Sequence, residues 1–139
     1  MAGLDSDFLN VIQPINVVTA YNTVSDSELG TFETTQDRFF LASLEQEYIV
    51  PQIAGEGLYW PYWKERLELE SPQPQGSGGA NANHIRYRYN AHTTAVACRL
   101  RSAYRGYAYY TWYVGSSTGV AYYTSSTSSI RGCPACVIR

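Results

Sequence analysis

Residues 107–129 read "YAYYTWYVGSSTGVAYYTSSTSS" and hold six Tyr, six Ser and four Thr with no charged residue. The runs "YAYYTWYV" and "VAYYT" flank the turn "GSSTG", which predicts a β-hairpin. Side chains alternate between the two faces of a strand, so Trp112 and Val114 share the face that we expect to be buried. Tyr107, Tyr109 and Tyr113 would then point outward on the other face.

The rest of the chain predicts short helices before this hairpin and strands around it. A helix is expected to begin at Asp5 or Ser6 and end before Pro14, because the residue before a proline leaves the helical region. Ser43 is placed to cap a helical turn with Glu45 and Glu47 in its first turn, where the helix dipole favours acids. The other expected elements are strands at 15–21, 38–42, 84–90 and 94–102, a helix within 57–70 and a flexible surface insertion at 71–83.

Length and composition indicate one α+β domain over residues 1–139. The chain has 45% apolar and 16% charged residues, a balance typical of a globular protein. No run approaches the roughly 18 apolar residues of a membrane span, and the N-terminus lacks a basic signal-peptide region. We therefore expect no membrane insertion and no signal peptide.

Charge is divided unequally along the chain. Residues 1–70 contain all 12 acids and three bases, a balance of −9, whereas residues 71–139 contain seven Arg and no acid. One interpretation is that the halves pack together, with arginines meeting carboxylates at the seam. The alternative is a basic face for a polyanion, but the arginines are spaced and Lys is nearly absent, so no nucleic-acid partner is expected.

The three cysteines, Cys98, Cys133 and Cys136, are too few for a disulfide framework. "CPAC" has redox and metal-binding spacing, but only three residues follow Cys136, which leaves no helix for a thioredoxin-like site. Zinc would need further ligands from Cys98, His84 or His92. The favoured interpretation is buried structural cysteines, with no metal and no cofactor.

No catalytic constellation is evident, and we expect no enzyme activity. "GSSTG" matches the Gly-x-Ser-x-Gly of a nucleophile elbow, but no acid lies beyond Glu70 and no His beyond His92. Glu65, Glu68 and Glu70 have the spacing of a solvated helix face, and the histidines are expected to make ordinary surface or strand-edge hydrogen bonds. A Tyr-rich surface with Ser, Thr and Gly between the rings is typical of antibody paratopes. The structural alternative is a sheet surface stabilised by cross-strand aromatic pairs.

Four blocks of the sequence, "DRFFLASLEQ", "CRLRSAYRG", "TWYVGSSTGV" and "RGCPACVI", resemble the C-type-lectin-like domains of phage and prokaryotic proteins. The blocks cover most of residues 37–138. Among these domains the chain looks most like the variable proteins of diversity-generating retroelements, in particular those ending in Pro-Ala-Cys-Val-Ile. The resemblance implies a C-type-lectin-like fold with short helices in the N-terminal half and an antiparallel β platform in the C-terminal half.

The resemblance also implies that adenine-directed mutagenesis rewrites AAC codons within a variable region at about 104–130, giving Tyr, Ser, Thr, Gly, Ala or Asn. From Arg99 to Arg139 there is no Lys, Glu, Gln or Met. The implied scaffold is Leu100, Arg101, Ser102, Arg105, Gly106, Trp112, Val114, Gly119, Val120, Pro134 and Ala135. The implied binding residues are Tyr104, Tyr107, Tyr109, Tyr110, Tyr113, Tyr122, Tyr123, Thr124, Ser126 and Thr127. Tyr110 is included through the resemblance, since alternation puts it on the inward face.

By this resemblance the protein is a display domain that binds a protein or glycan receptor on a host cell surface. Its place would be a virion, as in a tail fibre, or a prokaryotic cell surface within a larger assembly. Calcium-dependent sugar binding is not expected, because the C-terminal half has no carboxylate for the cation. The copper-dependent formylglycine-generating enzymes have a similar fold, but Cys133 and Cys136 are expected on a scaffold strand. The alternative function is a structural virion domain, a tail or capsid decoration, that uses the same face for subunit packing.

Overall fold

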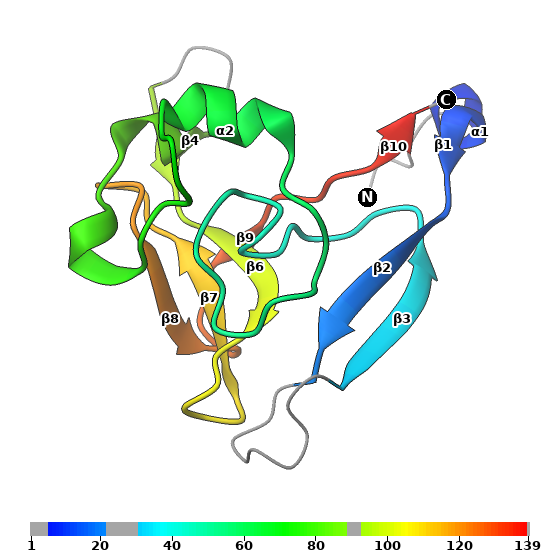
Figure 1. Cartoon of the computed structure of the whole chain (residues 1–139). Helices are drawn as coiled ribbons and strands as arrows, with labels where there is room; N and C mark the ends of the chain where they lie inside the picture. The colour runs from blue at the N-terminus through cyan, green and yellow to red at the C-terminus, as the bar shows by residue number, and fades with distance from the viewer. Residues whose placement is uncertain (1–5, 22–30, 89–92, 139) are drawn as a thin grey trace.

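The computed structural model describes residues 6–21, 31–88 and 93–138 and has an α+β fold (Figure 1). Small antiparallel sheets and one four-stranded sheet are joined by long ordered segments, and few residues are helical. Among the described residues no helix is long and apolar enough to cross a membrane. The elements in chain order are α1 (Ser6–Val11), β1 (Ile12–Gln13), β2 (Ile15–Ala20), β3 (Phe32–Asp37), α2 (Pro61–Leu67), η2 (Gly76–Gly79), η3 (Ala82–His84), β4 (Arg86–Tyr87), β5 (Ala95–Val96), β6 (Cys98–Ala103), β7 (Tyr110–Val114), β8 (Ala121–Ser125), β9 (Arg131–Gly132) and β10 (Val137–Ile138).

The four-stranded sheet has the order β8-β7-β6-β9 and contains the hairpin expected from the sequence. Strands β7 and β8 pair antiparallel with Trp112 opposite Tyr123 and Val114 opposite Ala121. Leu100 of β6 is buried with Trp112, Val114 and Ala121 in the main core. The opposite side of this core comes from residues 42–49, so the sheet is covered by an irregular segment rather than by a helix.

Two small sheets hold the N-terminal half of the chain. Strands β2 and β3 form an antiparallel hairpin that stands beside the main body, with β3 on its outer side (Figure 1). Strand β1 pairs with β10, which brings Ile12 opposite Ile138 (Figure 1). The expected strand at 15–21 is confirmed as β2, whereas β3 is a polar strand that the sequence patterns did not indicate.

The N-terminal helix and the turn after Ser43 agree with the sequence. Helix α1 ends at Val11, before Pro14. Ser43 and Gln46 cap each other: the Gln46 N–H donates to Ser43 Oγ and the Ser43 N–H donates to Gln46 Oε1, both at 3.2 Å. Glu45 instead accepts from the N–H groups of Gly55 and Glu56 and so holds the following loop.

The expected strand at 38–42 is wrong, since this segment makes only an isolated bridge between Phe40 and Ala135. Two other carbonyls of this segment accept hydrogen bonds from Arg101, outside any strand ladder. The carbonyl of Leu41 accepts from the Arg101 guanidinium at 2.8 Å, and the carbonyl of Ala42 accepts from the Arg101 N–H at 2.9 Å. Arg101 therefore takes the carbonyls that a neighbouring strand would need.

The sequence predicts a flexible surface insertion at 71–83. Part of this segment is exposed, but some of its residues are buried and hydrogen-bonded. Gln73 is 1% exposed, and Gly79 is buried. The Gln73 amide donates to the carbonyls of Gly79 at 2.6 Å and Gly119 at 2.8 Å. This segment therefore packs against the turn of the β7–β8 hairpin.

A disulfide joins Cys98 of β6 to Cys133, with a Cα–Cα distance of 5.8 Å, and Cys136 is a half-buried free thiol. The favoured sequence interpretation of buried structural cysteines is therefore right for Cys98 and wrong for the exposure of Cys133 and Cys136. The two cysteines of "CPAC" are not bonded to each other. Strand β9 runs parallel to β6 with Cys98 opposite Arg131, which places Cys133 within reach of Cys98.

Candidate binding surface

Five tyrosines gather at the open end of the β7–β8 hairpin and form what we call the aromatic cluster: Tyr104, Tyr107, Tyr109, Tyr110 and Tyr123. Tyr104 stacks on Tyr123 with ring centroids 3.6 Å apart and an interplanar angle of 13°. Tyr110 lies 5.0 Å from both Tyr107 and Tyr109. Tyr107 is 53% and Tyr109 is 60% exposed. The cluster is thus a continuous aromatic surface whose outer rings face solvent.

Trp112 lies beneath the cluster and connects it to the core. Its ring meets Tyr104 at 5.7 Å and Tyr123 at 5.5 Å, both edge to face, while Trp112 itself is 2% exposed. Edge-to-face and offset stacked pairs of this kind contribute about 0.5–1.5 kcal/mol beyond the area they bury. The cluster therefore rests on a fixed aromatic base.

The loop that carries Tyr104 to Tyr109 is fixed by Gln52, a residue that no sequence pattern singled out. Gln52 Oε1 accepts from the Arg105 N–H at 2.9 Å and from the indole N–H of Trp112 at 3.3 Å. Strand β6 also changes register between Arg99 and Ala103, so this end of the sheet is irregular. The amide of Gln52 cannot be assigned such a role from sequence, because it lies 53 residues from Arg105.

Arg99 holds the opposite arm of the hairpin. Its guanidinium donates to Thr111 Oγ1, to the carbonyl of Ser125 at 3.2 Å and to the carbonyl of Ser128 at 2.8 Å. These bonds join β6, β7 and the turn after β8. An arginine that donates to several carbonyls holds them in fixed relative positions, because its planar guanidinium fixes the direction of each N–H.

Tyr104 is the half-buried centre of the cluster. Its hydrogen bond with Tyr123 raises the pKa of Tyr104, and burial and the neighbouring tyrosines raise this pKa further. The Tyr104 hydroxyl therefore keeps its proton to a higher pH than a free tyrosine does.

The ten residues that the resemblance implies as binding residues lie in three different places in the structure. The five of the aromatic cluster lie together, on the side of the sheet that carries Trp112. Tyr113 and Tyr122 are opposite each other on β7 and β8, on the reverse face of the hairpin. Thr124 bonds to Ser128 at 3.2 Å, the Ser126 N–H donates to the Tyr109 carbonyl at 2.8 Å, and Thr127 bonds to Ser125 at 2.8 Å, all around the turn after β8.

The expectation that Tyr107, Tyr109 and Tyr113 point outward is confirmed for Tyr107 and Tyr109, which are exposed, and is wrong for Tyr113 and for the shared strand face. Strand β7 begins at Tyr110, so Tyr107 and Tyr109 lie in the preceding turn and strand alternation does not apply to them. Tyr113 is half-buried on the reverse face. Tyr110 does lie on the Trp112 side, as alternation predicts, and it still contacts the exposed rings because the cluster itself lies on that side.

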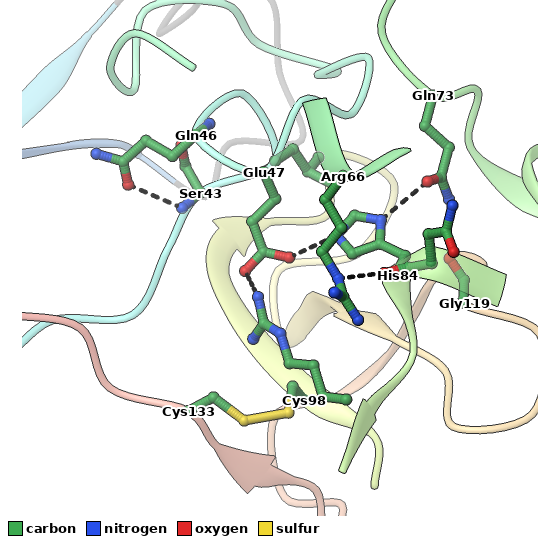
Figure 2. Close-up of polar contacts among 12 residues, drawn as sticks. Ser43, Gln46, Glu47, Arg66, Gln73, His84, Cys98, Gly119 and Cys133 are labelled. Atoms are coloured by element: carbon green, nitrogen blue, oxygen red, sulfur yellow. Dashed lines mark hydrogen bonds and ion pairs between the residues drawn. A yellow bond between two sulfur atoms is a disulfide. The ribbon is translucent and has the colours of Figure 1, made fainter. Parts of the chain in front are cut away.

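A buried polar network fixes the other end of the hairpin, near Gly119 (Figure 2). His84 is 0% exposed and has Gln73 Oε1 at 2.9 Å from Nδ1 and Glu47 Oε2 at 3.0 Å from Nε2. Arg86 donates to the other oxygen of Glu47. The expectation that His84 makes ordinary surface or strand-edge bonds is therefore wrong, because the ring is enclosed beside Trp63, with centroids 4.6 Å apart.

A second network ties β2 to β6. Arg101 donates to the carbonyls of Val18 and Leu41 and to that of Glu56. The Glu56 carboxylate accepts from the Ala20 N–H at 3.0 Å and from the Ser102 hydroxyl. Burial raises the pKa of Glu56; its bonds with Ser102 and Ala20 and the charge of Arg101 oppose this shift. The network fixes β2 and the segment around Glu56 against β6, the strand that leads into Tyr104.

Contacts between arginines and carboxylates are few in the described part of the chain. Arg86 forms an ion pair with Glu47, whereas Arg99 and Arg101 bond mainly to carbonyl oxygens. Glu65, Glu68 and Glu70 are exposed, as the sequence predicted. Within the described residues, Arg101 thus joins the two halves through carbonyl oxygens and Arg86 joins them through an ion pair, whereas the bonds of Arg99 stay within residues 71–139.

The arrangement offers rings and hydroxyls for contact. Within the described ranges no group of three His, Cys, Asp or Glu is placed to hold a metal ion. The "GSSTG" segment joins two antiparallel strands, β7 and β8, rather than a strand and a helix. His92 lies outside the described residues.

Comparison with known proteins adds no assignment: no family model, curated protein or solved structure matches this chain.

Proposed function

We propose that the protein is a display domain of C-type-lectin-like fold that binds a protein or glycan receptor on a host cell surface through the aromatic cluster. In this proposal it is a variable protein of a diversity-generating retroelement and forms part of a virion, such as a tail fibre, or of a prokaryotic surface assembly. It performs no catalysis and needs no cofactor.

The observation that carries the proposal is the accumulation of solvent-facing tyrosines over a buried tryptophan. Tyr107, Tyr109 and Tyr123 are all at least 41% exposed, and the stretch 107–129 contains no charge. Tyrosine supplies large, rigid and amphipathic contact area with few rotatable bonds, which is why it dominates antibody paratopes. Exposed contiguous aromatic patches on a protein mark interaction sites more often than chance.

The separation of scaffold from display supports diversification. Trp112 and Val114 are buried, and Gly119 has a φ of +66° that a side chain would strain. Tyr107 and Tyr109 make no side-chain hydrogen bond in the described part of the chain, and the aromatic rings that theirs meet there belong to other tyrosines of the cluster. Their replacement by Ser or Thr would therefore alter the surface and leave the sheet intact.

Sequencing the DNA that flanks the coding region tests the diversification. A near-identical repeat with AAC codons at positions such as 107, 109 and 123 is expected beside a reverse transcriptase gene. Homologous loci that lack this repeat and differ at bases unrelated to adenines would overturn the proposal.

Binding to intact host cells tests the surface itself. We expect Tyr107→Ser with Tyr109→Ser to reduce cell binding of the purified chain at least tenfold in flow cytometry. Tyr62→Ser is the matched control, because Tyr62 is 58% exposed on α2, outside the cluster. Equal loss in both variants would contradict a role for the cluster, and burial of the same tyrosines against a neighbouring subunit in purified particles would favour the structural virion domain.

A further inference from the structure

The outer edge of strand β3 is the longest strand edge that the described part of the chain leaves open. Strands β2 and β3 pair from Ile15–Asp37 to Ala20–Phe32, and the next pair is bonded through the Tyr21 N–H and the Thr31 carbonyl at 3.2 Å. Bonded and non-bonded pairs alternate in an antiparallel ladder. Phe32, Thr34 and Gln36 therefore direct their backbone N–H and C=O groups away from β2.

The backbone N–H and C=O groups of β2 that point away from β3 face the main body of the protein. Two of them have hydrogen-bond partners there. The Val18 carbonyl accepts from Arg101 at 3.0 Å, and the Ala20 N–H donates to Glu56 at 3.0 Å. These two bonds on β2 confirm that bonded and non-bonded pairs alternate along β2 and β3. In contrast, the outward backbone groups of Phe32, Thr34 and Gln36 have no partner among the described residues.

Other strand edges of the described structure are covered or short. The far edge of β8 is contacted by η2, and Ala121 on that edge is 0% exposed. Strands β9 and β10 have two residues each. Strand β3 has six residues, lies on the outer side of the hairpin (Figure 1) and carries no proline. An open edge of this length is a template for another strand.

We propose that β3 pairs with β3 of a second copy of this chain, antiparallel about a two-fold axis at Thr34. In this register Thr34 lies opposite the partner's Thr34, and Phe32 lies opposite the partner's Gln36. The outward N–H and C=O groups of both copies then bond to each other. The product is a continuous sheet with the order β2-β3-β3-β2, an isologous contact of the kind that closed dimers use.

The charges of β3 favour this self-pairing over the parallel alternative. In the two-fold register Glu33 lies opposite the partner's Thr35, and Asp37 lies opposite the partner's Thr31. A parallel pairing in register would place Glu33 and Asp37 against the same acids of the partner, which like-charge repulsion disfavours. Threonine is β-branched and suits strands, so the central Thr34 pair adds a favourable contact. The dimer would present the aromatic cluster twice, because the cluster lies on other strands.

Sedimentation equilibrium of the full chain over a range of concentrations tests the proposal. The wild-type chain is expected to reach a mass twice that of its 15.6 kDa monomer. Thr34→Pro removes an outward N–H at an edge, where proline is tolerated, and is expected to give only monomer. Thr34→Val is the matched control, because it keeps the N–H and the β-branched shape, and it should remain dimeric.

A wild-type chain that stays monomeric up to its solubility limit would overturn the proposal, including the case in which it captures an extended peptide of another protein instead. A Thr34→Pro variant that is folded by circular dichroism and still dimeric would overturn it too. Hydrogen exchange of the wild-type chain decides the matter if this variant fails to fold. Amides of Phe32, Thr34 and Gln36 should gain protection with concentration, whereas those of Glu33, Thr35 and Asp37 stay protected throughout; equal exchange of the first three at low and high concentration refutes self-pairing.

Discussion

The two ends of the β7–β8 hairpin are held by different physical means. At the turn end, Gln73 and His84 make directional hydrogen bonds in a site closed to solvent, beside Gly119. At the open end, tyrosine rings lie on one another and on Trp112, and the outer rings face solvent. Buried polar groups require particular partners, whereas a substitution at an exposed side chain usually changes stability little. The turn end should therefore be more sensitive to substitution than the exposed rings of the open end.

His84→Ala should give the largest effect, at the turn end. It leaves Glu47 buried with Arg86 alone and removes the ring between Glu47 and Gln73. Each buried group left without its hydrogen-bond partner costs about 1–3 kcal/mol in the free energy of unfolding, and Gln73 and Glu47 both lose one. Urea denaturation at pH 7 measures this loss, and a change below about 1 kcal/mol would show that the network is dispensable.

Gly119→Ala should be next. A Cβ at Gly119 would lie 2.0 Å from the Asn81 carbonyl oxygen, and the residue has a φ of +66°. Backbone strain of this kind costs about 1–3 kcal/mol. Gly78→Ala is the matched control, because a Cβ there meets nothing within 4 Å. Thermal unfolding should separate the two variants clearly; equal melting temperatures would mean that the turn end adapts as easily as the cluster.

The pH dependence of stability tests the network around Glu56, which ties β2 to β6. Burial raises the pKa of Glu56 above its usual 4.5, so the folded state holds this proton more tightly than the unfolded state. The contribution of Glu56 to stability is full below pH 4.5 and decreases as the pH rises through the raised pKa. Glu56→Gln should flatten this part of the profile in urea titrations at several pH values. A parallel profile in the variant would assign the pH dependence to other groups.

Tyr109→Ser should have the smallest effect on stability. Tyr109 is 60% exposed and contacts Tyr107 and Tyr110 only through its ring. Surface substitutions of this type change the free energy of unfolding by within about 0.5 kcal/mol. Urea denaturation beside the His84→Ala variant gives the comparison directly. A loss similar to that of His84→Ala would make the cluster part of the core rather than a display surface.

Much of the local structure could be predicted from the sequence, because it depends on near neighbours. Pro14 limits α1, Ser43 caps its turn with Gln46, and the alternation around Trp112 predicts β7 with its buried face. The exposure of Glu65 follows from its helical spacing, and Glu68 and Glu70 lie at and beyond the end of α2. In each case the physical cause acts over a few residues, so it is visible in the pattern.

Other features depend on residues that are distant in the chain. The place of strand β3, the role of Gln52 and the burial of His84 come from partners 11 to 60 residues away. The direction of Tyr107 and Tyr109 also could not be read from alternation, because β7 begins at Tyr110. No local pattern records these contacts, since a polar residue looks the same whether water or a buried partner satisfies it.

The sequence by itself determined that the C-terminal half forms β-strands with a buried tryptophan and a surface of uncharged tyrosines and hydroxyls. Composition and alternation suffice for this, because they act residue by residue. Only the tertiary structure decided which tyrosines meet. Tyr104 and Tyr123 stack because β6 shifts register and delivers Tyr104 beside β8. Tyr113 and Tyr122 lie on the reverse face, because strand pairing, rather than the identity of the residues, assigns each ring to its side of the sheet.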